Sequence, residues 1–306
     1  MSVGVRWREL LLVILVLMIL VLLALPRIRH ALHERDRLAC QENLRRWSVI
    51  FSMYSHEDPG NRYPPMATAA RTGIAPREGM LPFHATPFGA AVYPNYMTEL
   101  DKHICPGSRY ELAMLDGPDG VWRDPGSGER GPARFVSPDY IYYGYLLTAP
   151  GHAATLAAAL LEGAGEDADA DVSLAGALAL DEMPALIDEH FGAAFAERGV
   201  PAPEPGSPVA AERLLRLQRG AHVWLGDPLA GEFPRDEAAR EIPIMWDRCA
   251  MDASGQVRAH HLGDGFWPGP AGHVLYMDGS VAPMEYGDGF PMDPASAVLH
   301  DLLPAG

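Results

Sequence analysis

Residues 10–25 read LLLVILVLMILVLLAL, an unbroken run of apolar side chains, and this stretch decides the fold. As a helix it spans about 24 Å, slightly less than the roughly 30 Å hydrocarbon core of a bilayer, and Trp7 and Ile28 can extend it. A cleaved secretory signal is the alternative, but Leu25-Pro26-Arg27 lacks the small residues of a cleavage site. The run therefore predicts a retained membrane anchor. Basic residues on both sides leave its orientation open.

The helical pattern continues beyond the apolar run. Residues 28–54 contain no glycine or proline, and Asp58-Pro59-Gly60-Asn61 then ends the pattern. The sequence predicts one helix from about Val5 to Glu57, apolar on all sides in its first half and amphipathic in its second. The apolar stripe of the second half consists of Cys40, Leu44, Trp47, Phe51 and Tyr54.

The composition limits the classes of function. The chain has 306 residues, with 24 basic and 40 acidic side chains and a net charge of −16. This charge argues against nucleic acid as a partner, because phosphate binding needs a basic surface. The 31 glycines and 28 prolines predict long loops.

Three cysteines, Cys40, Cys105 and Cys249, are too few for a disulfide scaffold. Cys40 lies on the apolar stripe and Cys105 precedes a proline in a loop, so these two can meet where the helix packs on the sheet. In an oxidising compartment we favour a bridge between Cys40 and Cys105. The alternatives are a bridge from Cys249 to either of them, or no bridge and three buried thiols.

The C-terminal part predicts strands. The runs 273–277 and 280–284 flank Asp278-Gly279, which indicates a hairpin with a two-residue type I′ turn. Residues 242–246 and 140–147 are further strand candidates. Roughly three to five antiparallel strands packed on the amphipathic half of the helix give an α+β fold.

Four parts follow along the chain. Residues 1–27 form a leader and transmembrane anchor, residues 28–150 the helix and the start of a globular domain, and residues 221–306 the strands that complete it. Residues 151–220 are alanine-rich and are predicted to be a helical insertion. Its predicted helices cover residues 152–163, 172–197 and 209–219, and its proline-rich linker covers residues 201–208.

The N-terminus carries a family resemblance. Gly4 lies five positions before Glu9 and Pro26 lies seventeen positions after it, with an apolar stretch following the glutamate. This arrangement resembles the N-terminal region of type IV pilins and type II secretion pseudopilins, which a prepilin peptidase cuts after the glycine. The resemblance implies processing between Gly4 and Val5 and a role in assembly for Glu9 and Pro26.

Glu9 is the ionisable group within the anchor. A carboxylate at the centre of a bilayer costs roughly 2.5 to 3.5 kcal/mol, so it needs a partner or an interfacial position. After a cut behind Gly4, the charged N-terminus of Val5 can pair with Glu9 of a neighbouring subunit, as the resemblance implies. The alternative is that Glu9 reaches the lipid headgroups beside Arg8.

Further motifs resemble pilin-like proteins that carry a prepilin-type H-x9-DG processing-associated signature. Pro268 stands where that signature has its histidine, and Ser280 replaces the histidine after Asp-Gly. The resemblance implies a structural subunit that polymerises with other pilin-like subunits on an assembly platform of a bacterial inner membrane, with its domain on the periplasmic or extracytoplasmic side. The motifs are Cys40-Gln-Glu-Asn-Leu44, Tyr63-Pro64-Pro65, Cys105-Pro106, Pro138-Asp139-Tyr140, residues 242–247, residues 273–281 and Phe290-Pro291.

Histidines and aspartates near the C-terminus give the alternative function. They can bind zinc or a similar ion if their loop folds back, which would make the chain a single-pass membrane enzyme or binding protein that uses residues 247–278. Asp278 and Asp288 are also weak calcium candidates, although they do not follow the EF-hand pattern. Because no catalytic motif is present, we expect no enzyme and no required cofactor. The metal candidates are His260, His261, His273, Asp247, Asp264 and Asp278.

Overall fold

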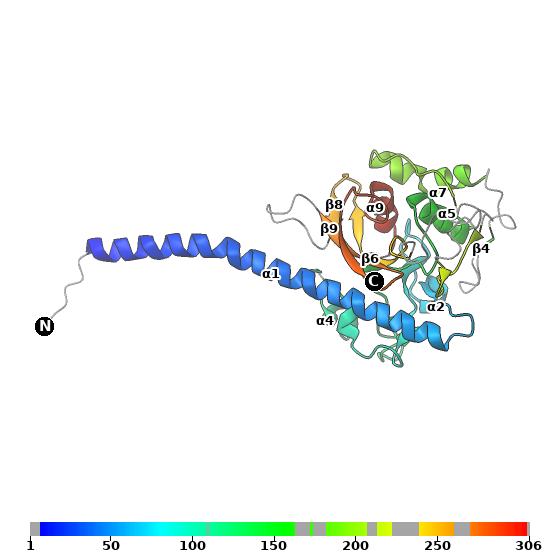
Figure 1. Cartoon of the computed structure of the whole chain (residues 1–306), viewed down its shortest axis with the longest axis horizontal. Coiled ribbons are helices and arrows are strands. Elements are labelled where there is room, and N and C mark those ends of the chain that lie inside the picture. The colour runs from blue at the N-terminus through cyan, green and yellow to red at the C-terminus, as the bar shows by residue number, and fades with distance from the viewer. Residues whose placement is uncertain are drawn as a thin grey trace.

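The longest element of the computed structural model is α1, Trp7–Glu57, a single helix of 51 residues that is about 77 Å long. Its first half projects away from the globular head and its second half lies along the head (Figure 1). Pro26 lies inside α1 without ending it, which confirms one continuous helix. The structure describes residues 7–108, 110–162, 172–173, 182–206, 213–221, 239–259 and 270–304.

The second half of α1 buries the predicted stripe. Cys40, Leu44, Trp47 and Phe51 are each 0% exposed, and Tyr54 is partly buried. The ring of Phe51 stacks on that of Tyr142, with 4.9 Å between the ring centroids. This stripe gives α1 one face that packs on the head, as its spacing of three and four residues requires.

A four-stranded antiparallel sheet forms the centre of the head. Its strand order is β10-β9-β6-β3, and α1 packs against β9 and β10. The small antiparallel sheet predicted from the sequence is therefore present. The strands are β3 (Tyr140–Ile141), β6 (Pro243–Asp247), β9 (Ala271–Tyr276) and β10 (Val281–Glu285).

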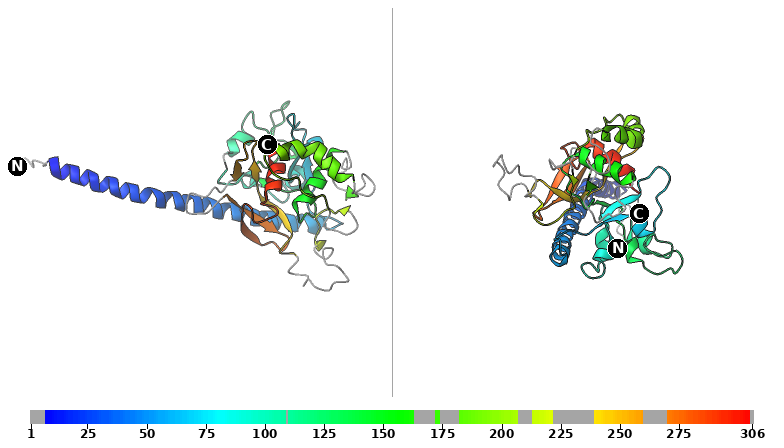
Figure 2. Two further views of the ribbon diagram at one scale, coloured as in Figure 1. Left: turned by 90° about the horizontal axis from the view of Figure 1, so that it is seen from above. Right: turned by 90° about the vertical axis from the view of Figure 1, so that its right-hand side faces the viewer.

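The two faces of this sheet are covered by different parts of the chain. Leu275 on β9 belongs to the apolar cluster that includes the α1 stripe, whereas its neighbour Val274 belongs to the cluster that includes α5, α7 and α9. Successive side chains of a strand point to opposite faces, so the head has three layers, with the sheet in the middle. Figure 2 shows these helices on the side of the sheet away from α1. They are α5 (Pro150–Leu161), α7 (Met183–Glu197) and α9 (Pro294–Asp301).

Helix α5 lies in the main core. Its alanines at positions 153, 154, 157, 158 and 159 are at most 1% exposed, and Leu156 is 0% exposed. Small side chains let neighbouring helices approach closely, and α5 contacts both α7 and α9. The region predicted as an insertion therefore supplies α5 and α7 of this layer, while α9 comes from the C-terminal part of the chain.

Short elements complete the head. A third apolar cluster centres on Trp122 and Phe135, whose ring centroids are 5.3 Å apart. The remaining elements are β1 (Met66–Thr68), α2 (Ala69–Thr72), β2 (Phe83–Pro87), α3 (Gly89–Val92), η1 (Leu100–His103), α4 (Leu112–Asp116), η2 (Pro132–Arg134), β4 (Val172–Ser173), β5 (Arg213–Leu214), β7 (Cys249–Met251) and β8 (Val257–Ala259).

The helix predicted at residues 209–219 is wrong for its described part. Residues 213–214 form β5, which pairs with β4. The predicted helix 172–197 is also wrong at its start, because residues 172–173 form β4. Arg216 forms a separate, isolated antiparallel bridge with Tyr145. Its guanidinium donates to the carbonyls of Tyr63 and Pro64 at 3.0 and 3.1 Å. These contacts with a distant segment hold the backbone extended.

The predicted strand at residues 140–147 is mostly wrong, because β3 ends at Ile141. Residues 142–147 remain buried, but Gly144 has a φ of 74° and turns the chain away from the sheet. Tyr145 pairs with Arg216 in an isolated bridge, so burial together with short local pairing explains why this apolar run resembles a strand.

The hairpin between β9 and β10 is confirmed, but its predicted turn type is wrong. Gly279 has a φ of 85°, whereas Asp278 does not have a positive φ. Gly279 N donates to Tyr276 O, and Tyr276 N donates to Ser280 O, both at 2.9 Å. This pattern is a three-residue loop with a glycine bulge, a second arrangement that Asp-Gly sequences favour.

Candidate functional site

The first half of α1 exposes apolar side chains along its length. Leu11 is 60% exposed and Leu20 is 56% exposed. Within the described residues, α1 is the one helix long and apolar enough to cross a membrane. Gly4 and Val5 lie outside the described residues, as does the side chain of Glu9.

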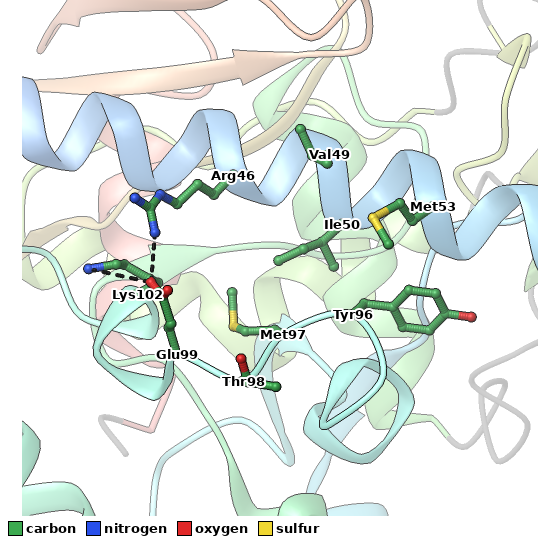
Figure 3. Close-up of a pocket in the computed structure, with 9 residues that line it drawn as sticks. All are labelled: Arg46, Val49, Ile50, Met53, Tyr96, Met97, Thr98, Glu99 and Lys102. Atoms are coloured by element: carbon green, nitrogen blue, oxygen red, sulfur yellow. Dashed lines mark hydrogen bonds and ion pairs between the residues drawn. The ribbon is translucent and has the colours of Figure 1, made fainter.

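A pocket lies beside the second half of α1 (Figure 3). Ile50 from α1 points toward Met97 across it, and Arg46 Nη1 pairs with Glu99 Oε2 at 2.7 Å on its rim. The pocket is shallow and apolar, with charges at one end. These contacts attach the loop before η1 to the helix.

Polar side chains gather where α1 crosses the sheet, in what we call the junction cluster: Cys40, Cys105, Tyr140, Asp247 and His273. Cys40 Sγ donates to Asp247 Oδ1 at 2.9 Å and lies 3.4 Å from the hydroxyl of Tyr140. Asp247 Oδ2 accepts from the backbone N of His273 at 2.8 Å and lies 3.0 Å from its Nδ1. Every member is at most 2% exposed.

The elements around the cluster position it. Tyr140 pairs with Asp247 in the ladder between β3 and β6, and His273 shares a face of β9 with Leu275. Cys40 comes from the buried stripe of α1. Four segments that are far apart in the sequence therefore meet at one point.

The loop that carries Cys105 is also held in place. Cys105 N donates to Asp139 Oδ2 at 2.8 Å, and Ser108 Oγ donates to Asp139 Oδ1 at 2.6 Å. Asn43 Nδ2 on α1 donates to the carbonyl of Ile104 at 3.1 Å. The thiol of Cys105 lies beside that of Cys40.

Burial controls the ionisation of the cysteines. It raises the pKa of the Cys40 thiol well above its usual value, with additions from the hydrogen bond to Cys105 and the charge of Asp247. Burial likewise raises the pKa of Cys249 to about 12. Without a cation these thiols stay protonated at neutral pH, which is unsuited to nucleophilic catalysis.

The structure brings together two of the predicted pairs of site residues. Cys40 and Cys105 are in contact, but both are thiols, so the predicted bridge is not formed in this structure. Asp247 and His273, from the predicted metal group, are in contact with each other and with Cys40. The sequence did not indicate that Cys40 and Tyr140 would join them.

Other predicted site residues lie in separate local structures. Asp278 Oδ1 accepts from Ser280 N and Oγ within the hairpin loop, at 2.8 and 2.6 Å. Asp288 Oδ2 accepts from Glu285 N at 3.2 Å. His260, His261 and Asp264 lie outside the described residues.

No family model, no curated protein and no solved structure matches this chain.

Proposed function

We propose that this chain is a membrane-anchored structural subunit of the pilin-like kind, which polymerises into a pseudopilus or a short type IV pilus-like fibre. The observation that carries the proposal is the division of α1, whose first half exposes apolar side chains while its second half packs on an antiparallel sheet. Such a helix can hold a head at a bilayer and can also pack beside copies of itself.

The exposed half of α1 needs an apolar environment. Its side chains from Leu10 to Leu25 are mostly 42 to 64% exposed, and burying an exposed leucine stabilises by about 1.5 to 3 kcal/mol. Lipid or neighbouring helices provide that burial. The absence of an α1 interruption at Pro26 supports a rigid subunit rather than a head on a flexible tether.

The resemblance at the N-terminus supplies the proposed partners. A prepilin peptidase would cut between Gly4 and Val5, and an inner-membrane assembly platform would add the subunit to a polymer. The head would lie on the periplasmic or extracytoplasmic side. In the polymer the new N-terminus at Val5 would pair with Glu9 of a neighbouring subunit, while Pro26 would lie in the bundle of packed helices.

Processing is tested by expressing the full chain with and without a prepilin peptidase and sequencing the N-terminus of the membrane-extracted protein. We expect Val5 as the first residue only when the peptidase is present. Gly4→Arg should block the cut, because the resemblance places the cut directly after this glycine and the substitution removes it. An unchanged N-terminus in the presence of an active peptidase would contradict the processing step.

Polymerisation is tested separately by crosslinking in membranes. Glu9→Ala should insert normally, since removing a charge makes the span more apolar, and should reduce crosslinked oligomers. Glu42→Ala is the control, because this glutamate lies on α1 beside the head and pairs with Arg46 at 3.7 Å. Equal crosslinking of Glu9→Ala and the unchanged chain at equal expression would reject the role of Glu9.

The alternative of a membrane-anchored metal enzyme has less support. Asp247 and His273 are 1% and 2% exposed, so a substrate cannot reach them in this conformation. A hydrolytic metal centre keeps an open coordination position that solvent and substrate can enter.

A further inference from the structure

We propose that Cys40, Cys105, Asp247 and His273 form a buried structural zinc site that fastens α1 to the sheet. The inference is independent of the proposed function, because it concerns the joint between helix and head and holds whether or not the chain polymerises.

The donor atoms already converge. One ligand atom from each of Cys40, Asp247 and His273 lies within 4.8 Å of the other two. Ligands about 2.0 to 2.3 Å from a tetrahedral zinc ion lie about 3.3 to 3.8 Å from one another. The pairs Cys40 Sγ to Asp247 Oδ1, at 2.9 Å, and Asp247 Oδ2 to His273 Nδ1, at 3.0 Å, would need to open by less than 1 Å.

Cys105 supplies the fourth ligand. Its thiol lies beside that of Cys40, and both cysteines are at most 1% exposed. The backbone N of Cys105 is fixed by Asp139 at 2.8 Å, so the loop presents the thiol toward α1. Cys105 is not among the three residues whose ligand atoms lie within 4.8 Å of one another, so its thiol would have to turn from Cys40 toward Asp247 and His273 to complete the site.

This donor set suits zinc. Thiolate and imidazole are its commonest ligands, and carboxylate is a third. On binding, the two thiols release their protons, so a doubly charged cation replaces them next to Asp247. The ion would add a positive charge beside Asp247, which already accepts hydrogen bonds from Cys40 Sγ and from the backbone N of His273.

The carboxylate is also oriented for a metal. The backbone N of His273 donates to Asp247 Oδ2 at 2.8 Å, and this bond can persist while Oδ1 turns to the ion. Hydrogen bonds of this kind fix the orientation of metal ligands. The β9 backbone therefore holds Asp247 in place for the site.

Full burial makes the site structural. Four protein ligands leave no open position, and all four residues are at most 2% exposed. Because the ligands come from α1, a loop, β6 and β9, the ion would tie together segments up to 233 positions apart in the sequence. Zinc binding would then be part of folding.

A disulfide between Cys40 and Cys105 is the competing outcome. Its formation passes two electrons to an oxidant and removes both thiol protons, including the one that Cys40 donates to Asp247 Oδ1. A buried carboxylate oxygen would lose that donor, whereas zinc replaces it with a cation. The geometry therefore favours the metal over the bridge.

The test uses the full chain extracted in detergent under reducing conditions. We expect about one zinc ion per chain by elemental analysis, and replacement by Co²⁺ should produce thiolate-to-cobalt charge-transfer absorption. Cys40→Ser and Cys105→Ser should lose that absorption and the bound metal. Cys249→Ser is the matched control, since Cys249 is also 1% exposed but lies in the other core cluster, and it should keep both.

A second measurement does not need a folded variant. Titrating the thiols of the unchanged protein with a mercurial should release zinc in step with modification of two cysteines. Absence of zinc and of cobalt absorption in reduced, folded protein would overturn the proposal. So would mass spectrometry that finds Cys40 joined to Cys105 in protein taken from its native membrane.

Discussion

Residues 10–29 and residues 40–57 belong to one helix, yet the first group leaves its leucines exposed while the second buries Cys40, Leu44, Trp47 and Phe51 of its stripe. The backbone hydrogen bonds are alike in both halves, so the difference lies in the side chains. The first half has apolar residues all round, which no single face of a soluble head can cover. The second half has apolar residues at every third or fourth position, so they lie on one face of the helix and the head can cover that face. Helix geometry is thus shared, while the surroundings that stabilise each half differ.

Removing residues 1–29 gives the largest expected effect. The truncated chain should leave the membrane fraction entirely, because it loses the exposed apolar side chains that lipid would cover. Its head should keep cooperative unfolding, since residues 10–29 make no buried contact in the described structure. Ultracentrifugation measures loss from the membrane fraction, and thermal unfolding monitored by circular dichroism measures the cooperativity of the head. Truncated protein that stays with membranes would contradict the division.

Trp47→Ala should destabilise the head by about 3 to 5 kcal/mol, because Trp47 is 0% exposed and its loss leaves a cavity between α1 and the sheet. Membrane association should not change. Leu17→Ala, in the exposed half of the same helix, is the control and should alter the free energy of unfolding by less than about 0.5 kcal/mol. Urea unfolding in detergent measures both. Equal effects of the two substitutions would remove the distinction between the halves.

Acid should destabilise the head and leave the anchor unaffected. Burial lowers the pKa of His300 to about 3 and that of His84 to about 4. The unfolded chain, where histidine has a pKa near 6.5, binds these protons first, so stability falls as the pH drops from about 6.5 to 4. The slope should reach up to about 1.4 kcal/mol per pH unit for each histidine.

Urea unfolding at a series of pH values across this window measures the slope. His300→Gln should reduce it, while His33→Gln, at an exposed position on α1, should not. The membrane-bound fraction should stay constant over the same range. A flat profile of stability against pH would show that the buried histidines keep their ordinary pKa values.

Arg46→Ala should have the smallest effect. Arg46 pairs with Glu99 at 2.7 Å, but the two side chains are 45% and 61% exposed, so solvent screens the pair. We expect a loss of about 0.2 to 1 kcal/mol that shrinks further at high salt. A double-mutant cycle with Glu99→Ala separates the interaction free energy of the Arg46–Glu99 pair from the other effects of each substitution. A loss comparable with that of Trp47→Ala would place the main attachment of α1 at the pocket rim.

The course of α1 was predictable because helical periodicity is a local property. The spacing from Cys40 to Tyr54 identifies the buried face without knowledge of what covers it. The segment around Arg216 was not predictable, since Leu214 and Leu217 fit a helix face as well as a bridged extended chain. Contacts of Arg216 with carbonyls more than 150 positions away decide between the two. The pattern of apolar residues along a short segment cannot indicate which distant carbonyls that segment will contact.

The junction cluster was predictable only in its parts. The sequence placed Cys40 on the buried stripe and Asp247 and His273 among metal candidates, but Cys40 and Asp247 are 207 positions apart. One sequence carries no signal that pairs two such residues. The turn at Asp278-Gly279 shows a milder limit, because the same dipeptide serves both a two-residue and a three-residue loop.

The stretch of α1 between its exposed half and the first fully buried position, Cys40, has a mechanical consequence. Residues 31–39 of this stretch are exposed or partly buried and span about 14 Å of helix. A glycine-rich tether of equal length would bend and twist under thermal motion, but a helix resists both. Tension or torque applied at the exposed end of α1 would therefore be transmitted to the sheet, and if that end is held in a bilayer the helix would fix the orientation of the head relative to the lipid surface.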